Sequence, residues 1–316
     1  MRVSFLVLSS DEAPLLEHSL EAAMAESPDE LLVVDNASRD ATAEVARRHG
    51  AQVLRLPERV PYTHAMNAGL RELHGDAVAM LQADLFVAPG YRAAAAAALA
   101  DTEVGSVAPK LVRTLGPRPE QRLGELDAAG MFLDRRRKNG LVGHGRPVGA
   151  YARAGEVFGA DGAAALYRRA ALEDCAIDGR VFDEDMPGWG CDADLAWRAR
   201  LLGWRSVYEP AAIAHHIRTY SPTTRALMSE ADRRTQFRNR YLMMAKNDSA
   251  TDLARDLHRI ALYELLAFGH VVLRERHLLR GYREAWRGLP AARRVRRDVQ
   301  ARRRVRRVPF GLEAPA

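Results

Sequence analysis

A short segment near the middle of the chain combines two carboxylates with a tryptophan between glycines. Residues 187–198 read Pro-Gly-Trp-Gly-Cys-Asp-Ala-Asp-Leu-Ala-Trp-Arg. Asp192 and Asp194 precede leucines at helical spacing, so we expect them in the first turn of a helix, where negative charge is favoured. A carboxylate held there can take a proton from a substrate hydroxyl. Trp189 before Gly190 offers a flat surface for a sugar ring. On residue type alone, aspartates that only cap the helix are an equally open interpretation.

This segment resembles the acidic segment of inverting family 2 glycosyltransferases, written roughly Gly-Trp-Gly-Glu-Asp-x-Asp-Leu-x-x-Arg. The resemblance implies that Asp192 is the general base that deprotonates the acceptor hydroxyl, with Asp194 as the second catalytic candidate. It also implies that Trp189 and Gly190 bind the acceptor. Cys191 replaces the first acid of the family pattern.

The first third of the chain alternates short apolar strands with helices. Strands are predicted at 3–8, 31–34, 52–56 and 77–81, with helices at 14–25, 40–49 and 63–73. This order predicts an α/β fold with a mostly parallel, doubly wound sheet, in which ligands bind beyond the carboxyl ends of the strands. Three polar clusters follow such ends and are expected to converge on one crevice: Ser9–Glu12, Asp35–Ser38 and Gln82–Asp84.

The second cluster, Asp35-Asn36-Ala37-Ser38-Arg39-Asp40, resembles the Val-Asp-Asn-x-Ser-x-Asp segment of the same family. That resemblance implies that Asp35 contacts the nucleobase of the donor. The alternative is an ordinary Asx turn with a helix cap. The family also has an Asn-x-Gly motif, which Asn67 begins in this chain. Strand-end position or the resemblance makes the following residues candidates for donor binding: Ser9, Asp11, Asp35, Asn36, Ser38, Asn67 and Asp84.

The third polar cluster, Gln82–Asp84, is the candidate site for a metal ion. Many family members carry Asp-x-Asp here, holding a divalent cation on the donor diphosphate. In this chain Gln82 replaces the first aspartate, which is similar to the Leu-Asn-Pro-Asp variant of rhamnosyltransferase-like members. The resemblance implies Mg²⁺ or Mn²⁺ at Asp84, since both prefer oxygen ligands. His215 or His216 would complete the site, and spacing from Pro210 favours His216. A structural role is the alternative for this histidine pair.

Composition limits the class of protein. The chain has 316 residues, of which 47% are hydrophobic and 28% charged, as in soluble globular proteins. Two cysteines are too few for a disulfide framework and suggest a reducing, cytoplasmic setting. The longest apolar stretches are shorter than the roughly 18 residues that a membrane span needs. The net charge of +6 is concentrated in residues 291–307, which hold nine arginines and one aspartate.

These patterns suggest four parts: a nucleotide-sugar-binding half (1–110), an acceptor-binding and catalytic half (111–222), a helical extension (223–290) and a basic tail (291–316). Within the second half we expect a mobile loop at 135–153 and a strand at 157–167. The extension should break near Asp248 and Gly281, and its apolar stripe at 257–272 should pack on the body.

The resemblance covers residues 1–245 and implies the GT-A fold. It also implies transfer of a sugar, with inversion, from a nucleotide-diphosphate sugar (dTDP-rhamnose or a UDP-sugar) to a glycan or lipid-linked acceptor. One alternative is a catalytically degenerate nucleotide-sugar-binding protein. Another is a nucleotidyltransferase, which would need a glycine-rich loop with a lysine where Ser9-Ser10-Asp11-Glu12 stands.

The basic tail suggests a partner of opposite charge. An anionic membrane surface fits best, because juxtamembrane arginines are attracted to acidic lipids. It would make the enzyme peripheral on the inner face of the membrane. Nucleic acid is disfavoured, because the tail has no interleaved aromatic residues and the body is near neutral.

Overall fold

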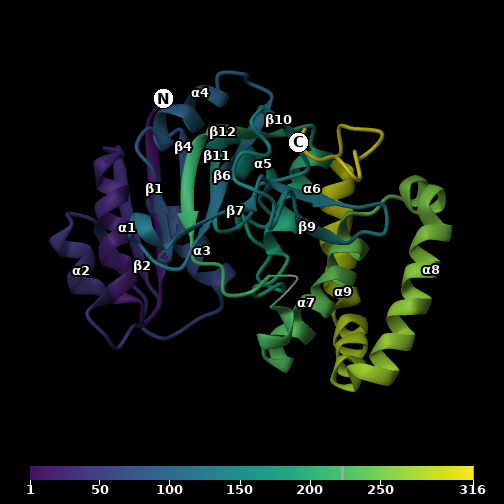
Figure 1. Cartoon of the computed structure of the whole chain (residues 1–316). Coiled ribbons are helices and arrows are strands. Elements are labelled where there is room, and N and C mark those ends of the chain that lie inside the picture. Colours follow the sequence, from purple (N-terminus) through teal and green to yellow (C-terminus); the bar gives the residue numbers. More distant parts are fainter. Residues whose placement is uncertain (222–223, 316) are drawn as a thin grey trace.

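A computed structural model describes residues 1–221 and 224–315 (Figure 1). The described residues form one ten-stranded sheet with the order β10-β12-β6-β11-β4-β1-β2-β3, while β5 and β7 pair with β12 and β6. Strands β1, β2, β3, β4, β6 and β12 point the same way, and β10 and β11 run against them. The predicted mostly parallel α/β fold is therefore confirmed. The strands are β1 (Val3–Ser9), β2 (Glu30–Asp35), β3 (Gln52–Arg55), β4 (Ala77–Gln82), β5 (Leu85–Val87), β6 (Val104–Thr114), β7 (Arg122–Ala128), β10 (Gly155–Val157), β11 (Ala164–Arg168) and β12 (Arg205–His216).

Helices cover both faces of this sheet. Side chains alternate between faces along a strand, so Phe5 and Val7 of β1 pack with one set of helices and Leu6 with the other. Because both faces are covered, the central strands are almost wholly apolar. The first face carries α1 (Ala13–Ala25), α2 (Thr42–Arg48) and α4 (Tyr91–Ala98), and the second carries α3 (Tyr62–Glu72), α5 (Arg169–Cys175) and α6 (Cys191–Leu201).

The middle of the chain differs from the prediction in two places. The strand expected at 157–167 is two strands, β10 and β11, which pair with different partners in the sheet. The loop expected at 135–153 contains β9 (Asn139–Leu141), which forms a hairpin with β8 (Met131–Leu133). Both predictions were wrong because these strands are short and depend on partners distant in sequence. The backbone of Met131, for example, bonds in both directions with Gly159.

Three long helices follow the sheet: α7 (Glu230–Asn247), α8 (Ala250–Arg274) and α9 (Leu279–Ala301). Short 3₁₀ turns lie at Pro119–Gln121, Arg225–Leu227 and Arg276–Leu278. Helices α7 and α9 run side by side, and α8 stands at the outer edge (Figure 1). No helix in the described part of the chain is long and apolar enough to cross a membrane.

The predicted break near Asp248 is confirmed, and the second break lies at 275–278, shortly before the predicted Gly281. Gly281 lies inside α9, and a Cβ added there would come within 2.9 Å of the Phe237 ring on α7. The glycine allows the two helices to approach closely. Helix α9 also continues across position 290, so the first part of the predicted basic tail is helical.

A buried arginine joins the β8–β9 hairpin to the C-terminal helices. The Arg137 side chain has no exposed surface, and it pairs with Asp248 at 2.8 Å and Asp256 at 2.9 Å. Its guanidinium lies 3.7 Å from the centre of the Phe310 ring. One side chain thus connects the hairpin, the turn between α7 and α8, and the C-terminal segment.

Candidate active site

The carboxyl ends of three neighbouring strands form one edge of the sheet. In the parallel register Ser9 of β1 lies opposite Asp35 of β2, and Leu8 lies opposite Gln82 of β4. The three polar clusters noted in the sequence therefore meet at this edge, as expected.

Asp35 is buried and has one unused oxygen. Its Oδ1 accepts the Ser38 N–H at 2.8 Å, and Arg55 Nε lies 3.6 Å from Oδ2. Among the described residues no group donates a hydrogen bond to Oδ2, and the Ser9 hydroxyl likewise lacks a partner. Buried polar atoms without partners are costly. Both atoms are buried, so a ligand at the strand ends would reach them, and supply their missing partners, only if the side chains that cover them move.

The other polar residues predicted on the donor side are engaged with the protein itself. The Asn36 side chain makes two hydrogen bonds with the Val60 backbone, at 2.8 and 2.9 Å. The Asp11 N–H donates to Ser38 Oγ at 3.1 Å, and the Asp11 carboxylate pairs with Arg59 at 2.5 Å. These contacts hold the loops that border the crevice.

Asp84 and His216 are in contact beside the strand ends. His216 Nε2 lies 3.5 Å from Asp84 Oδ1, and its Nδ1 lies 2.7 Å from Asp127 Oδ2. Burial would lower the pKa of His216, but the carboxylates of Asp127 and Asp84 outweigh it and raise that pKa to about 9. Of the two candidate histidines, His216 is the one in contact with Asp84.

Asp84 and His216 could supply part of a metal site. The described residues contain no cluster of three His, Cys, Asp or Glu side chains able to enclose an ion. Mg²⁺ and Mn²⁺ on a nucleotide diphosphate need fewer, because phosphate oxygens and waters complete the coordination. Asp127 behind His216 Nδ1 is the outer carboxylate that commonly orients a ligating histidine. Asp84 and His216 therefore fit a cation that is shared with a diphosphate and that displaces the proton held on His216 at neutral pH.

A charged cluster that the sequence reading missed lies beside this pair. Arg218 Nε donates to Asp127 Oδ1 at 2.8 Å, and its terminal nitrogen donates to Asp161 Oδ1 at 2.9 Å. Burial raises the pKa of Asp127, but His144, His216 and Arg218 outweigh it and hold that pKa well below its usual range. These residues lie after β12, at the end of β7 and before β11, so no local motif connects them.

Asp192 lies next to the charged cluster, in the first turn of α6. Gly190 begins the helix with a left-handed φ of 84°, a conformation that favours glycine. The half-buried Asp192 accepts the Gly162 N–H on Oδ2 at 3.3 Å and the Ala193 N–H on Oδ1 at 2.8 Å. Desolvation, and then the charge of Asp161, raise the pKa of Asp192 to about 6. A carboxylate with that pKa suits general-base chemistry near neutral pH.

Asp194 has a different environment. It is buried and accepts from Arg198 at 3.1 Å, Lys246 at 3.0 Å and Asn247 at 2.8 Å. Burial raises its pKa, but Lys246 and Arg198 outweigh that effect and hold the pKa below its ordinary value. Asp194 thus connects α6 to the end of α7, and its oxygens are engaged inside the protein.

Trp189 is held in place from α7. Its indole N–H donates to Asp232 at 3.1 Å, and the Asn239 side chain donates to its backbone carbonyl at 2.9 Å. The indole meets Tyr220 edge to face, with the ring centres 5.8 Å apart. The loop before Trp189 is fixed by Asn67, whose amide pairs with the Phe182 backbone at 2.9 Å. Asn67 therefore shapes the crevice from behind.

The sequence model of Glycosyl transferase family 2 matches residues 4–176, more than half of the chain. The chain belongs to this family. It is accordingly a glycosyltransferase, and the nucleotidyltransferase alternative is set aside. The matched range contains the strand ends and Asp161, whereas Asp192 lies beyond it.

Solved glycosyltransferases share the GT-A fold of this family 2 enzyme. A mannosyltransferase from Pyrobaculum calidifontis, in complex with GDP-mannose and Mn²⁺, is 21% identical with a TM-score of 0.53, over 92% of this chain and 75% of that one. Residues 1–349 of TarS from S. aureus, in complex with UDP-GlcNAc, are 14% identical with a TM-score of 0.59, over 95% and 91% of the two chains. At these identities the likeness shows the fold alone.

One curated relative matches part of the enzyme. A TPR repeat-containing protein from Synechococcus elongatus is 35% identical over 83 residues, which is 26% of this chain and 20% of that protein. The match thus spans about a fifth of the length of that relative.

Proposed function

We propose that this enzyme transfers a sugar from a nucleotide-diphosphate sugar to a hydroxyl of a glycan or lipid-linked acceptor, with inversion. The observation that carries the proposal is Asp192, a half-buried carboxylate with a pKa of about 6 beside the polar edge of the sheet. The GDP-mannose and UDP-GlcNAc bound by two structural relatives support this donor class. Among its members, dTDP-rhamnose and UDP-sugars are the first donors to test, by ligand-induced thermal stabilisation with and without Mn²⁺.

In the proposed reaction Asp192 takes the proton of the acceptor hydroxyl while that oxygen attacks the anomeric carbon of the donor. The bond from this carbon to the diphosphate breaks on the opposite face, so the configuration inverts. Trp189 and Tyr220 form the acceptor surface, which orients the hydroxyl toward the donor. Asp194 is a positioning residue, because it fixes α6 against α7.

The donor is held at the strand ends. Asp35 accepts a hydrogen bond from the nucleobase through its unused Oδ2. Asp84 and His216 would hold a divalent cation on the diphosphate, and that cation would neutralise charge on the leaving group. Asp127 and Arg218 keep His216 oriented toward that position.

Replacing Asp35 by alanine should weaken nucleoside binding about tenfold or more, with or without metal, because one hydrogen bond to a charged group is lost. Isothermal titration with nucleosides and nucleoside diphosphates measures this. Asp40→Ala is the matched control, because Asp40 caps the chain near α1 and α2 through Ala13 and Thr42. If Asp35→Ala binds nucleosides as tightly as the unmodified enzyme, Asp35 does not contact the nucleobase and serves only the turn, through its bond to Ser38.

Replacing Asp84 by alanine should weaken Mn²⁺-dependent binding of the nucleoside diphosphate about tenfold or more, while affinity for the free nucleoside stays the same. The difference arises because Asp84 acts through the cation. EDTA should have the same effect on the unmodified enzyme. If EDTA changes neither donor affinity nor turnover, Asp84 does not hold a catalytic metal.

A further inference from the structure

Helix α8 turns an apolar face outward. Its buried residues are Asp252, Asp256, Ile260 and Val271. The expectation that the stripe at 257–272 packs on the body is therefore wrong for most of the stripe. The large apolar side chains exposed on α8 from its second turn onward, with the exposed fraction of each, are Leu257 (56%), Leu262 (60%), Leu265 (69%), Leu266 (65%), Phe268 (52%) and Leu273 (76%).

Polar anchors set this orientation. Asp256 pairs with Arg135 at 2.6 Å and with Arg137 at 2.9 Å. Two turns further on, Glu264 pairs with Arg240 at 2.6 Å and accepts from the Tyr241 hydroxyl at 2.5 Å. Since both carboxylates lie on the inner face of α8, the leucines must lie on the outer face.

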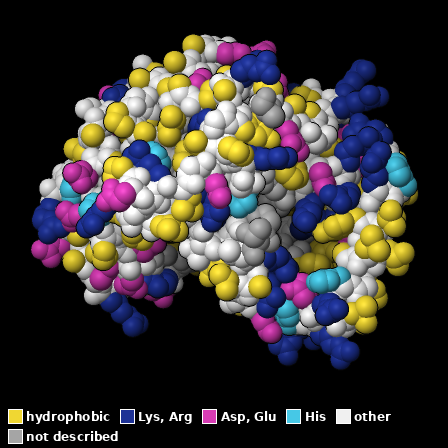
Figure 2. All heavy atoms as spheres, in the orientation of Figure 1, with side chains coloured by type: hydrophobic (Ala, Val, Ile, Leu, Met, Phe, Trp, Pro, Cys, Tyr) yellow, Lys and Arg dark blue, Asp and Glu magenta, His cyan; other side chains and the backbone are white. Residues whose placement is uncertain are grey.

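The outer face is positively charged as well as apolar. The exposed residues of α8 include arginines and histidines but no aspartate or glutamate. Apolar and basic side chains lie together along this edge of the molecule (Figure 2). The exposed basic and histidine residues of α8 are Arg255, His258, Arg259, His270 and Arg274, of which Arg255 pairs with the inner carboxylates Asp252 and Asp256.

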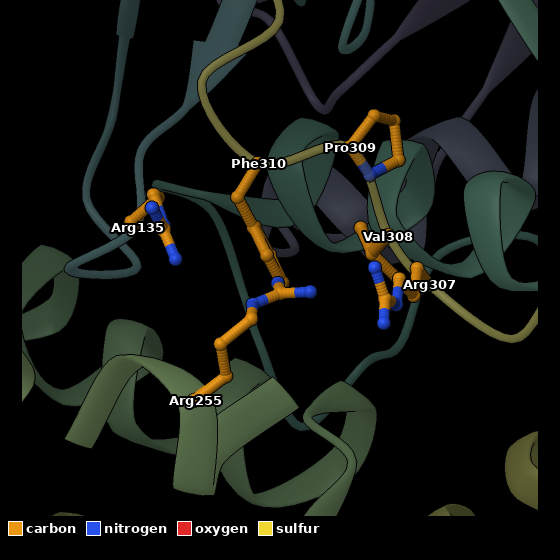
Figure 3. Close-up of a pocket in the computed structure, with 6 residues that line it drawn as sticks. All are labelled: Arg135, Arg255, Arg307, Val308, Pro309 and Phe310. Atoms are coloured by element: carbon orange, nitrogen blue, oxygen red, sulfur yellow. The ribbon is translucent and has the colours of Figure 1, made fainter. Parts of the chain in front are cut away.

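Two adjoining cavities open between α8, the hairpin turn and the C-terminal segment. The larger, of about 650 Å³, combines Arg259 and the Asp134–Arg136 ion pair with an apolar wall that includes Leu262 and Leu266. In the smaller, of about 410 Å³, Arg255 and Arg307 extend from opposite sides toward Phe310 (Figure 3). Guanidinium groups beside leucines match the chemistry of a phosphate headgroup with the first part of its acyl chain.

We propose that the outer face of α8 docks on an anionic lipid bilayer. The leucines enter the headgroup region and the bordering arginines contact lipid phosphates, as in interfacial amphipathic helices. A second copy of the chain is a poorer match, because symmetric pairing would set arginines against arginines with no exposed acid on α8 to oppose them.

The arginine-rich segment 291–307, the membrane contact suggested by the sequence, is partly engaged with the body. Arg302 donates to the Asp174 carbonyl at 2.6 Å, and Arg304 pairs with the Asp174 carboxylate at 2.9 Å. Helix α8 presents its leucines and arginines to solvent instead, so we assign it the main contact.

The surface also adjoins the acceptor side of the crevice, a link that rests on the proposed function. Glu275, directly after α8, pairs with Arg225 at 2.8 Å and Arg233 at 2.9 Å. Arg233 follows Asp232, which holds the indole of Trp189. A bilayer along α8 would therefore bring a lipid-linked acceptor close to Trp189.

The test is co-sedimentation of the full chain with phosphatidylcholine vesicles, with and without phosphatidylglycerol. Leu265→Gln/Leu266→Gln should lower the partition constant about tenfold or more, because apolar insertion is lost without a change in charge. The control is Leu115→Gln/Leu123→Gln, since Leu115 is 68% and Leu123 37% exposed outside α8. It should bind vesicles like the unmodified enzyme.

Arg259→Gln/Arg274→Gln should weaken binding to anionic vesicles about tenfold, with a smaller loss at high salt. Equal binding by the α8 leucine variant and its control would overturn the proposal, and so would no binding to anionic vesicles at low salt. A dimer seen by light scattering that only the α8 leucine variant dissociates, without vesicle binding, would assign the face to a second copy. Donor binding measured without vesicles reports on the proposed function separately.

Discussion

Replacing Asp192 by asparagine is expected to lower the rate of sugar transfer by about 10²–10⁴-fold while donor affinity stays the same. Asparagine preserves the size of the side chain, and its single carbonyl oxygen can still accept one of the Gly162 and Ala193 N–H groups, but it cannot take a proton. Single-turnover transfer rates and donor titration measure the two quantities separately. Near-normal transfer by this variant would remove Asp192 from the role of base.

The pH profile gives the same residue a second test. The base must be ionised to act, and the pKa of Asp192 is raised to about 6. Transfer should therefore rise with pH through about pH 6 and then level off. In Asp192→Asn this rising limb should disappear from the residual rate. If the rise of the transfer rate with pH persists unchanged in Asp192→Asn, the group that titrates near pH 6 is not Asp192.

Replacing Arg137 by methionine should lower the free energy of unfolding by about 3–5 kcal/mol. The change leaves Asp248 and Asp256 buried with fewer cationic partners, and it removes the guanidinium from the Phe310 ring. Urea denaturation followed by circular dichroism measures the loss.

The neighbouring Arg136 provides a matched control. Its side chain is 52% exposed and pairs with Asp134 at 2.7 Å. Arg136→Met should cost less than about 1 kcal/mol, as is usual for exposed ion pairs. Equal losses in the two variants would contradict the assignment of Arg137 as the connection between hairpin and helices.

Sequence alone predicted that the polar residues after β1, β2 and β4 lie at one edge of the sheet, because parallel strands align the residues that follow them. Ser9 and Asp35 are adjacent in the sheet for this reason. It also predicted the position of Asp192 in the first turn of a helix, since a glycine precedes the helical pattern there. Short-range periodicity and strand order suffice for features of this kind.

Features that depend on distant partners could not be predicted. The cluster of Asp127, Asp161 and Arg218 forms because three strand ends meet, and no spacing within the sequence encodes it. Residue type and spacing alone do not distinguish Asp194 from Asp192. The difference comes from Lys246 and Asn247 of α7, which occupy the oxygens of Asp194 inside the protein. In α8, periodicity identified the apolar stripe but not the salt bridge of Glu264 that turns it outward.

The most direct test of the central claim is the anomeric configuration of the sugar first released from the donor. The enzyme would be given the nucleotide sugar that stabilises it most, and the product followed by proton NMR before mutarotation. The account predicts a sugar of configuration opposite to that of the donor, formed much more slowly by Asp192→Asn. A first product of retained configuration, or one formed equally fast by Asp192→Asn, would contradict it.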